Sequence, residues 1–393
     1  MTDPIIIVGA GQAGMKAAET LRREGYDGEI ILAGAEGLRP YQRPPLSKAY
    51  LKGELAEERL FLKPEDYFEK EAISFLPALA VTAIDPADHR ATFADGSVRA
   101  YHKLLLATGT EARRIALPGL ELEGVFTLRG MADIAPIADA LAKAENIVII
   151  GGGFIGMEFA AVAAGFGKSV TVIESAPRIL MRSVATAVSN ALQELHRQNG
   201  VRLLLGQGVA AIEGHGRAEA VALAGGARLS ADLVLLAVGA NPLTDIAAAA
   251  GLAVDNGIVV DQACRTRAPD IFAAGDCTIF PSARYGRMIR LESVQNASDQ
   301  ARAAALSMLG QTVNYDPVPW FWSDQYKARL QIAGLSEGYD RTESEAGEDS
   351  LTLRYFRHDR LIAVDTINNP RAHMLARKTL AAEPVGRPKS DAA

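Results

Sequence analysis

Two glycine-rich segments do most to limit the folds open to this chain. Residues 9–14 (GAGQAG) follow the apolar run 5–8, and residues 151–156 (GGGFIG) follow the apolar run 147–150. Each segment has the pattern G-x-G-x-x-G between a strand-like run and a helix-like stretch, which is the setting in which this pattern binds dinucleotides. One copy is a weak indication, whereas two copies in the same setting predict two dinucleotide sites.

The three glycines of each copy have different tasks. The first makes the turn, the second lets the backbone approach a pyrophosphate, and the third lets the helix pack on the strand. The phosphates then lie at a helix N-terminus, where unpaired N–H groups and the helix dipole favour anions. These glycines are Gly9, Gly11 and Gly14 in the first copy and Gly151, Gly153 and Gly156 in the second. A chain with two such sites is most simply a flavoprotein that takes electrons from a nicotinamide nucleotide.

Composition agrees with a soluble globular protein of about two or three domains. The chain has 393 residues, of which 49% are hydrophobic and 22% are charged, and its formal net charge is -6. Such a balance gives no indication of nucleic acid or of an anionic membrane as a partner.

The ends of the chain and its cysteines bear on location. The N-terminus lacks the basic region of a signal peptide, and the mostly apolar stretch 147–173 is broken by Glu158, Lys168 and several glycines. Cys264 and Cys277 form no C-x-x-C pair, which excludes a disulfide framework and a redox dithiol. We therefore expect a cytoplasmic protein without a membrane span.

Strand-like and helix-like segments alternate, which predicts an α/β fold with parallel sheets. The simplest topology has two Rossmann-like domains arranged as in glutathione reductase, with one inserted in the other. We expect an FAD-binding domain over residues 1–109 and 239–315 and a NAD-binding domain over 110–238. A helix is expected at about 298–309. Aromatic residues at 320–322 and two later strand-like runs predict a C-terminal α+β domain over 316–393, with a mobile tail from residue 383.

An acidic residue ends the second strand-like run of the inserted half. Glu174 lies 23 residues after Gly151, where a carboxylate accepts the ribose hydroxyls of NAD and repels the 2′-phosphate of NADP. This position predicts NADH as the electron donor, although Arg178 is near enough to keep NADPH open. In the first half the acid is Glu36, one position late, so that either Glu36 or the backbone of Ala35 meets the ribose.

A second group of candidates follows the other strand-like runs. Asp276 is expected to accept a hydrogen bond from a flavin ribityl hydroxyl; the alternative is a helix N-cap, and one residue can have both roles. Backbone N–H groups near Val294 would stabilise the negative charge that a flavin gains on reduction, and plain capping by Ser293 or Ser298 is the alternative. We also expect cofactor contacts at the ends of these runs and within the second glycine segment, at Thr108, Gly109, Gly239, Gly275 and Ile155.

Several longer segments carry a family resemblance. Residues 39–48 (RPYQRPPLSK), 107–109 (ATG), 275–277 (GDC), 292–297 (ESVQNA) and 320–326 (WFWSDQY), together with the two glycine segments, resemble NADH-dependent ferredoxin reductases of oxygenase systems. The resemblance extends to about residue 371. The PPLSK and WFWSDQ segments are far more specific than either glycine segment.

The resemblance implies particular site residues. The matching positions contact FAD in the family, and they are Ala13, Ala35, Lys48, Val81, Arg129, Asp276 and Val294. It also implies that Trp322 packs near the isoalloxazine, and that Lys48 and Glu158 lie by the flavin ring near the path of the hydride. On electrostatic grounds Lys48 would stabilise anionic reduced flavin, and Glu158 would keep that charge paired. A purely structural ion pair is the alternative.

By the same resemblance, electrons pass from NADH through FAD to an acidic [2Fe–2S] ferredoxin, which serves a cytochrome P450 monooxygenase or a dioxygenase. Alternatives are a reductase of rubredoxin, monodehydroascorbate or a quinone, and an NADH-responsive binding protein that resembles apoptosis-inducing factor. A basic rim would speed the encounter with an acidic partner, and the candidates are Lys63, Arg302, Lys327 and Arg329. The six histidines show no metal-ligand spacing, and without a dithiol His373 has no catalytic task.

Overall fold

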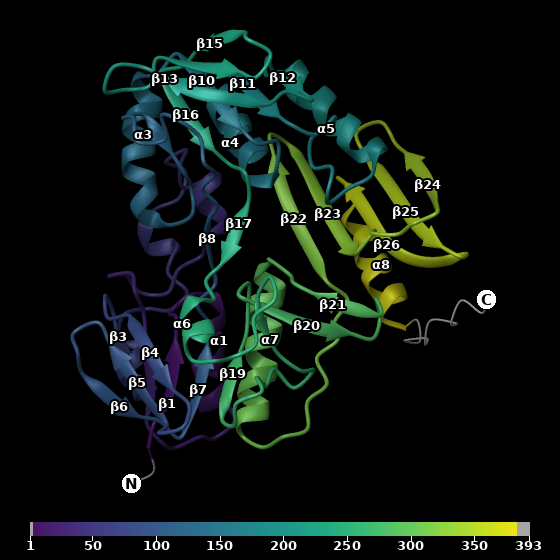
Figure 1. Cartoon of the computed structure of the whole chain (residues 1–393). Helices are drawn as coiled ribbons and strands as arrows, with labels where there is room; N and C mark the ends of the chain where they lie inside the picture. The colour runs from purple at the N-terminus through teal and green to yellow at the C-terminus, as the bar shows by residue number, and fades with distance from the viewer. Residues whose placement is uncertain (1–2, 383–393) are drawn as a thin grey trace.

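The structure, a computed structural model, describes residues 3–382. Its first sheet has five parallel strands in the order β19-β7-β1-β2-β3 (Figure 1). The strands are β1 (Ile5–Val8), β2 (Ile30–Ala33), β3 (Ile73–Leu76), β7 (Lys103–Leu106) and β19 (Ile271–Ala273). Because helices cover the sheet, most strands are continuous apolar runs rather than alternating ones.

The second sheet repeats this plan. Its five parallel strands have the order β12-β11-β10-β16-β9. They are β9 (Val125–Phe126), β10 (Asn146–Ile150), β11 (Ser169–Glu174), β12 (Arg202–Leu205) and β16 (Leu233–Leu236). The helices of this half are α3 (Ile134–Lys143), α4 (Phe154–Gly165) and α5 (Thr186–Gln198). The predicted α/β fold with two Rossmann-like domains is therefore confirmed, with one glycine turn at the end of β1 and the other at the end of β10.

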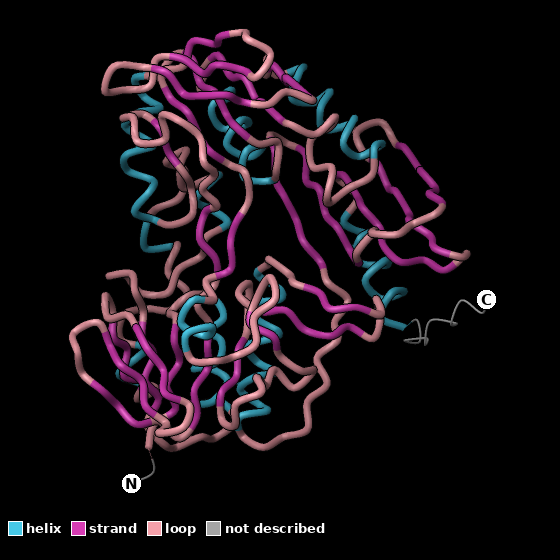
Figure 2. The backbone as a smooth tube through the Cα atoms, in the orientation of Figure 1, coloured by secondary structure: helices cyan, strands magenta, loops and turns pink. Residues whose placement is uncertain are grey.

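Each half also carries a three-stranded antiparallel sheet that we did not predict. These sheets are β4 (Val81–Asp85), β5 (Arg90–Phe93) and β6 (Val98–Ala100) in the first half, and β13 (Val209–Glu213), β14 (Ala220–Leu223) and β15 (Arg228–Ser230) in the second. A two-stranded ribbon, β8 (Thr110–Ala112) with β17 (Ala240–Pro242), carries the chain between the halves in both directions (Figure 2).

A third layer follows near the C-terminus. Five antiparallel strands have the order β22-β23-β26-β25-β24, and α8 (Pro370–Ala382) packs on them. The strands are β22 (Trp320–Gln325), β23 (Ala328–Gly334), β24 (Arg341–Ala346), β25 (Leu351–Arg357) and β26 (Arg360–Ile367). In Figure 1 this layer stands beside both halves, and β22 faces the space between them. The predicted mobile tail lies outside the described residues.

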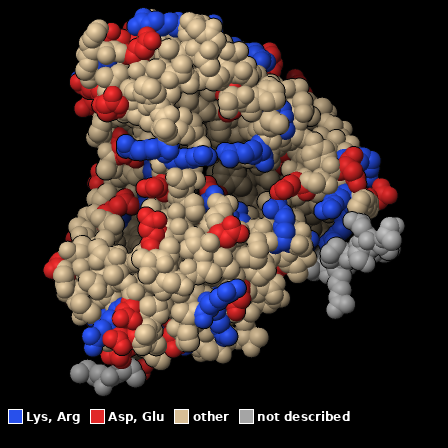
Figure 3. Space-filling view, in the orientation of Figure 1, with Lys and Arg blue, Asp and Glu red and all other residues tan. Residues whose placement is uncertain are grey.

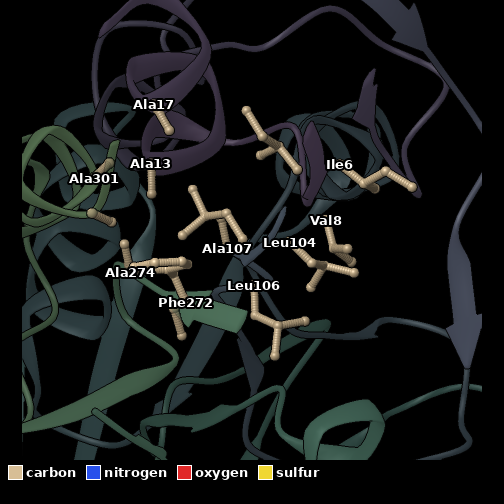
Figure 4. Packing of buried hydrophobic residues seen from close by; sticks show 14 of the residues in the cluster. Ile6, Val8, Ala13, Ala17, Leu104, Leu106, Ala107, Phe272, Ala274 and Ala301 are labelled. Carbon is tan, nitrogen blue, oxygen red and sulfur yellow. The ribbon is translucent and has the colours of Figure 1, made fainter. Parts of the chain in front are cut away.

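Small side chains bring the first half together. Helix α1 (Gln12–Arg23) packs against α7 (Val294–Met308), and Figure 4 shows Ala13 and Ala17 of α1 near Ala274 and Ala301. Alanines let two helices and a sheet approach closely without leaving voids. This packing holds the N-termini of α1 and α7 next to each other at one edge of the sheet.

Helix α7 begins earlier than predicted. The expected start near residue 298 is wrong, because the Ser293 hydroxyl accepts a hydrogen bond of 3.0 Å from the Asn296 N–H and caps a helix that starts at Val294. The shorter elements are α2 (Tyr67–Lys70), α6 (Asp245–Ala249), β18 (Ile258–Val259), β20 (Thr278–Ser282) and β21 (Arg287–Ile289). Asp276 lies in a short turn that leads into β20 and not into a helix, so the helix N-cap role for Asp276 is also wrong.

Candidate active site

The first and third glycines of each glycine-rich segment are required by the backbone around them. At Gly9 and Gly151 φ is +111° and +112°, and a Cβ there would lie 2.2 Å from the Ala107 oxygen and 2.3 Å from the Ala237 oxygen. The third glycines are as crowded: a Cβ on Gly14 would lie 1.8 Å from the Gly9 oxygen. The two sites thus have the same turn, built by the same contacts.

The middle glycines meet open space instead. A Cβ on Gly11 would have nothing within 4 Å, and one on Gly153 would have only the Ala237 oxygen at 3.9 Å. These glycines are also the N-caps of α1 and α4, and no side chain caps either helix. The first-turn N–H groups therefore face an open space, here called a cradle, that a Cβ would begin to fill. A bound pyrophosphate requires such open space beside free N–H groups.

Glu174 is fixed beside the second cradle. Its Oε2 accepts a hydrogen bond of 2.7 Å from the Gly152 N–H, and its Oε1 accepts one of 2.7 Å from the Ala176 N–H. Arg178 donates to the carbonyl oxygens of Val184 (2.7 Å) and Met181 (3.1 Å), so its guanidinium is held by the chain's own backbone. The arrangement favours NADH at this site.

The position of Glu174 predicts a preference for NADH over NADPH that can be measured. In E174Q the side chain keeps an oxygen for Gly152 but loses the negative charge, so we expect kcat/KM for NADH to fall about tenfold and the preference for NADH over NADPH to fall by a similar factor. Steady-state rates with both nucleotides and ferricyanide measure this. The control is S175A, whose wild-type hydroxyl only donates to Glu174; its preference should change less than about twofold. An unchanged preference in E174Q would contradict the assigned role.

The ribose end of the first site differs from the second. Ala35 is exposed just after β2, and the carboxylate of Glu36 is already engaged by the Arg43 guanidinium and by the Tyr41 hydroxyl at 2.5 Å. Arg43 also donates to the Arg129 carbonyl oxygen (3.0 Å). Glu36 is therefore paired within the protein but still exposed, so the Ala35 backbone and Glu36 both remain candidates for the ribose contact.

Lys48, which is 19% exposed, forms an ion pair with the buried Glu158. The Lys48 Nζ lies 2.7 Å from Glu158 Oε2, and the side chain of Glu158 is only 2% exposed. The same Oε2 accepts a bond of 2.6 Å from the Ser47 hydroxyl, and Oε1 accepts one of 2.6 Å from the Ser323 hydroxyl. One carboxylate on α4 thus joins the PPLSK segment to the first strand of the C-terminal sheet.

A cavity opens beside this pair. It has a volume of about 350 Å³, and its walls include Gln12 of α1, Lys48, Val294 at the start of α7, and Trp322. Trp322 stacks on Trp320 with ring centroids 5.7 Å apart, which fixes that wall. Residues from the first glycine segment, the PPLSK loop, α7 and β22 therefore meet at one aromatic-walled cavity, as the binding of a flavin ring requires.

Asp276 and Arg129 also meet. The Arg129 Nη2 lies 3.2 Å from Asp276 Oδ2, and the Arg129 Nε donates to the Thr110 carbonyl oxygen (2.9 Å). Burial raises the pKa of Asp276, and Arg129 opposes that rise. Gln300 of α7 holds the turn by accepting a bond of 2.8 Å from the Gly275 N–H. The turn thus presents Asp276 at the carboxyl end of β19.

The remaining predicted residues are described by their local structure. Thr108 donates to the Leu243 carbonyl oxygen (2.6 Å), and Val81 is buried at the start of β4. Gly109, Gly239 and Gly275 have positive φ values. Ile155 is 42% exposed in the first turn of α4, which leaves an apolar surface at the mouth of the second cradle.

Sequence reasoning missed several residues of the site. Ser47 and Ser323 are the hydroxyl donors to Glu158, and Gln300 supports the Asp276 turn. The two serines lie inside the PPLSK and WFWSDQ segments already singled out, but their common partner is 111 and 165 residues away. Within residues 3–382, no cluster of three or more His, Cys, Asp or Glu could hold a metal ion, and no helix is long and apolar enough to cross a membrane. Both cysteines are free and buried.

Comparison with known proteins agrees with this geometry. The family model described as pyridine nucleotide-disulphide oxidoreductase matches residues 3–301, and the one described as reductase C-terminal matches residues 320–392. Rhodocoxin reductase of Rhodococcus erythropolis is 42% identical over 96% of this chain and 90% of its own length. Rubredoxin-NAD(+) reductase of Pseudomonas putida is 40% identical over 93% of this chain and 96% of its own length.

A solved structure gives the same result. The covalent complex of putidaredoxin reductase with putidaredoxin contains a chain that matches with a TM-score of 0.94 at 38% identity, covering 96% of this chain and 93% of that one. With matches that span the glycine cradles, the Lys48–Glu158 pair and the aromatic sheet, this chain belongs to the pyridine nucleotide-disulphide oxidoreductase family, in the branch of ferredoxin reductases that carry the reductase C-terminal domain.

Proposed function

We propose that this protein is a flavoprotein oxidoreductase that passes electrons from NADH through FAD to a [2Fe–2S] ferredoxin serving a cytochrome P450 or a dioxygenase. The observation that carries the proposal is the cavity where the first glycine segment, Lys48, Val294 and Trp322 meet. The second cradle, with Glu174, supplies the nicotinamide nucleotide site.

FAD, when bound, supplies the ability to accept a hydride and to release electrons singly. The residues proposed to hold it are those of the first cradle, with Ala35, Val81, Arg129, Asp276 and Val294. Lys48 and the first-turn N–H groups of α7 place positive potential at the cavity, which stabilises negative charge formed there. Glu158 keeps the Lys48 ammonium fixed, and Trp322 closes one wall. The reaction needs no protein nucleophile.

We also propose the division of the chain into domains. Residues 1–109 and 239–315 form the FAD-binding domain, 110–238 the NAD-binding domain, and 316–393 the C-terminal domain. Support comes from the β8–β17 ribbon, which lies at both proposed crossings between the first two domains. A cytoplasmic location is proposed on the two free, buried cysteines.

The first experiment is anaerobic electron transfer from NADH to cytochrome c, with and without a [2Fe–2S] ferredoxin, and the same with NADPH. We expect cytochrome c reduction to depend on ferredoxin and on NADH. Rapid bleaching of the flavin by NADH without any dependence on ferredoxin would leave the cofactors in place and overturn the proposed acceptor.

A rubredoxin is the second candidate acceptor, because two of the relatives at 39–40% identity are rubredoxin-NAD(+) reductases. The same assay with rubredoxin in place of ferredoxin distinguishes the two. Turnover far below about one per second with every acceptor would instead favour an NADH-responsive binding protein.

An electrostatic docking surface is part of the proposal. Figure 3 shows Lys and Arg side chains in a row across the hollow between the upper and lower parts of this face. Of the predicted docking residues, Lys63 is paired with Glu19, and Arg329 lies 3.6 Å from Asp324. Arg302 and Lys327 are exposed and have no ion pair within the described part of the chain.

Charge reversal tests this surface. In R302E/K327E we expect the KM for ferredoxin to rise about tenfold, since cations at a docking rim mainly speed the encounter, while NADH-to-ferricyanide turnover stays the same. The control R228E reverses an exposed charge on β15, far along the chain from α7 and β22, and should change neither quantity. A parallel fall of both rates in R302E/K327E would contradict docking.

A further inference from the structure

Four polar side chains extend from Glu158 toward α5. The Ser323 Oγ lies 2.6 Å from Glu158 Oε1, and the Gln325 Nε2 lies 3.1 Å from Ser323 Oγ. The His196 Nε2 lies 2.9 Å from Gln325 Oε1, and the Tyr326 hydroxyl lies 3.3 Å from His196 Nδ1. Ser323, Gln325 and His196 are at most 1% exposed. Water therefore cannot readily replace these contacts.

The chemistry of each group fixes the direction of every bond. An ionised Glu158 only accepts, so the Ser323 hydroxyl donates to it and in turn accepts from the Gln325 amide. The Gln325 oxygen then needs a donor, which is the Nε2–H of His196. Burial lowers the pKa of His196 to about 4, so the ring is neutral at pH 7, and its Nδ1 accepts from Tyr326.

We propose that Tyr326, His196, Gln325 and Ser323 form one directed hydrogen-bond chain that holds the Glu158 carboxylate in the orientation that pairs with Lys48. They are positioning residues for hydride transfer from NADH. This inference rests on the proposed function, because it assigns Lys48 and Glu158 a place beside the flavin.

The distribution of donors on Glu158 gives the chain its effect. Oε2 is held by Lys48 and Ser47, whereas among residues 3–382 the hydrogen bond to Oε1 comes from Ser323 alone. Without that bond the carboxylate can rotate, and the distance from Oε2 to the Lys48 ammonium is no longer fixed. This hydrogen-bond chain orients the Glu158 carboxylate and does not conduct protons. The Gln325 amide in its middle does not pass a proton on as a hydroxyl or an imidazole does.

Substitutions at His196 distinguish the effect of the hydrogen-bond chain from the effect of side-chain packing. In H196F no donor faces Gln325, so its amide is free to turn, present oxygen to Ser323 and draw the serine hydroxyl away from Glu158. In H196Q the amide Nε2 stands where the histidine Nε2–H stood and can restore the donor. The control is H373F, because His373 is a second buried histidine, and neither of its ring nitrogens has a hydrogen-bond partner within the described residues.

The test uses the FAD-bound enzyme and two readouts. The first is nitrogen-15 NMR of histidine-labelled protein, with the His196 signals assigned by their loss in H196Q. We expect the Nε2–H tautomer at pH 7. The second is anaerobic stopped-flow reduction of the flavin by NADH. We expect the limiting rate to fall about tenfold in H196F and S323A, with the NADH concentration at half-maximal rate within about twofold of wild type, and to recover in H196Q.

Each outcome decides the matter. A His196 proton on Nδ1, equal losses in H196F and H196Q, or an equal loss in H373F would overturn the directed chain. Because flavin reduction by NADH does not involve the electron acceptor, these results stand apart from the ferredoxin assay: the chain is supported if the pattern holds even when ferredoxin proves not to be the acceptor.

Discussion

Replacing Lys48 by alanine is expected to lower the free energy of unfolding by about 3 kcal/mol, because it leaves the buried Glu158 carboxylate without its cation. The Ser47 and Ser323 hydroxyls still donate to that carboxylate, which places the cost at the low end of the range of about 3–5 kcal/mol for a broken buried pair. The shift of the urea unfolding midpoint of the FAD-bound protein measures the effect.

The double variant K48A/E158A shows whether the loss of stability in K48A comes from the unpaired charge. It contains neither charge, so it should be more stable than K48A, even though a second side chain has been removed. K63A is the matched control, since Lys63 pairs with Glu19 where both side chains are about one-quarter exposed; its cost should stay below about 1 kcal/mol. A double variant less stable than K48A would show that lost packing, not an unpaired charge, sets the cost.

The same pair marks the limit of what could be predicted from the sequence. The glycine cradles could be predicted because their features are local: the turn at Gly9 and the approach of Gly14 to Gly9 lie within six consecutive residues. The Lys48–Glu158 pair spans 110 positions, and residues alone do not show which carboxylate faces which ammonium. Only the resemblance placed them together, and the structure confirms that they meet.

At other places the sequence pattern that would predict an element or a contact was absent or ambiguous. Strand β24 is exposed along its whole length and has charged and polar residues without apolar alternation, so nothing distinguished it from a loop. The start of α7 was placed four residues late because Ser298 and Ser293 are both good caps, and only the hydrogen bond to Asn296 decides between them. At the first ribose site, nothing in the sequence showed that Arg43 would engage Glu36.

Asp365 is the other buried charge with a large expected effect, and it gives a pH dependence. It lies on β26 with no exposed surface, accepts a hydrogen bond from the Tyr355 hydroxyl, and leaves Oδ1 without a partner. Burial raises the pKa of Asp365 from 3.8 to about 7, and the bond from Tyr355 opposes that rise. Tyr355 in turn accepts a bond of 3.0 Å from the Ala185 N–H before α5, so the carboxyl is linked to the second half of the molecule.

The direction of this pH dependence follows from the number of protons that the folded and the unfolded chain bind. Below about pH 4 Asp365 is protonated in the folded and in the unfolded chain, and it contributes no pH dependence. Between about pH 4 and pH 7 the unfolded chain loses this proton while the folded protein keeps it, so stability falls as pH rises. Above about pH 7 the cost is constant, and a shift of about three pKa units corresponds to about 4 kcal/mol.

D365N should remove this cost, because asparagine has the shape and the donor of a protonated carboxyl. We expect D365N to match wild type near pH 4 and to be more stable by about 2–4 kcal/mol at pH 8. The difference between the two proteins is the quantity to measure, by urea unfolding across this range. Burial lowers the pKa of His196 and of His373 to about 4, and these histidines give wild type and variant the same opposite slope.

Y355F provides the second arm of this test. Without the phenol hydroxyl the Asp365 carboxylate loses its remaining donor, so its pKa should rise further and the loss of stability should continue to a higher pH. In Y355F/D365N the extra pH dependence should vanish again, since no carboxyl remains to titrate. A stability difference between D365N and wild type that is the same at pH 4 and pH 8 would mean that Asp365 is ionised in the folded protein throughout, with its charge balanced by a group other than Tyr355.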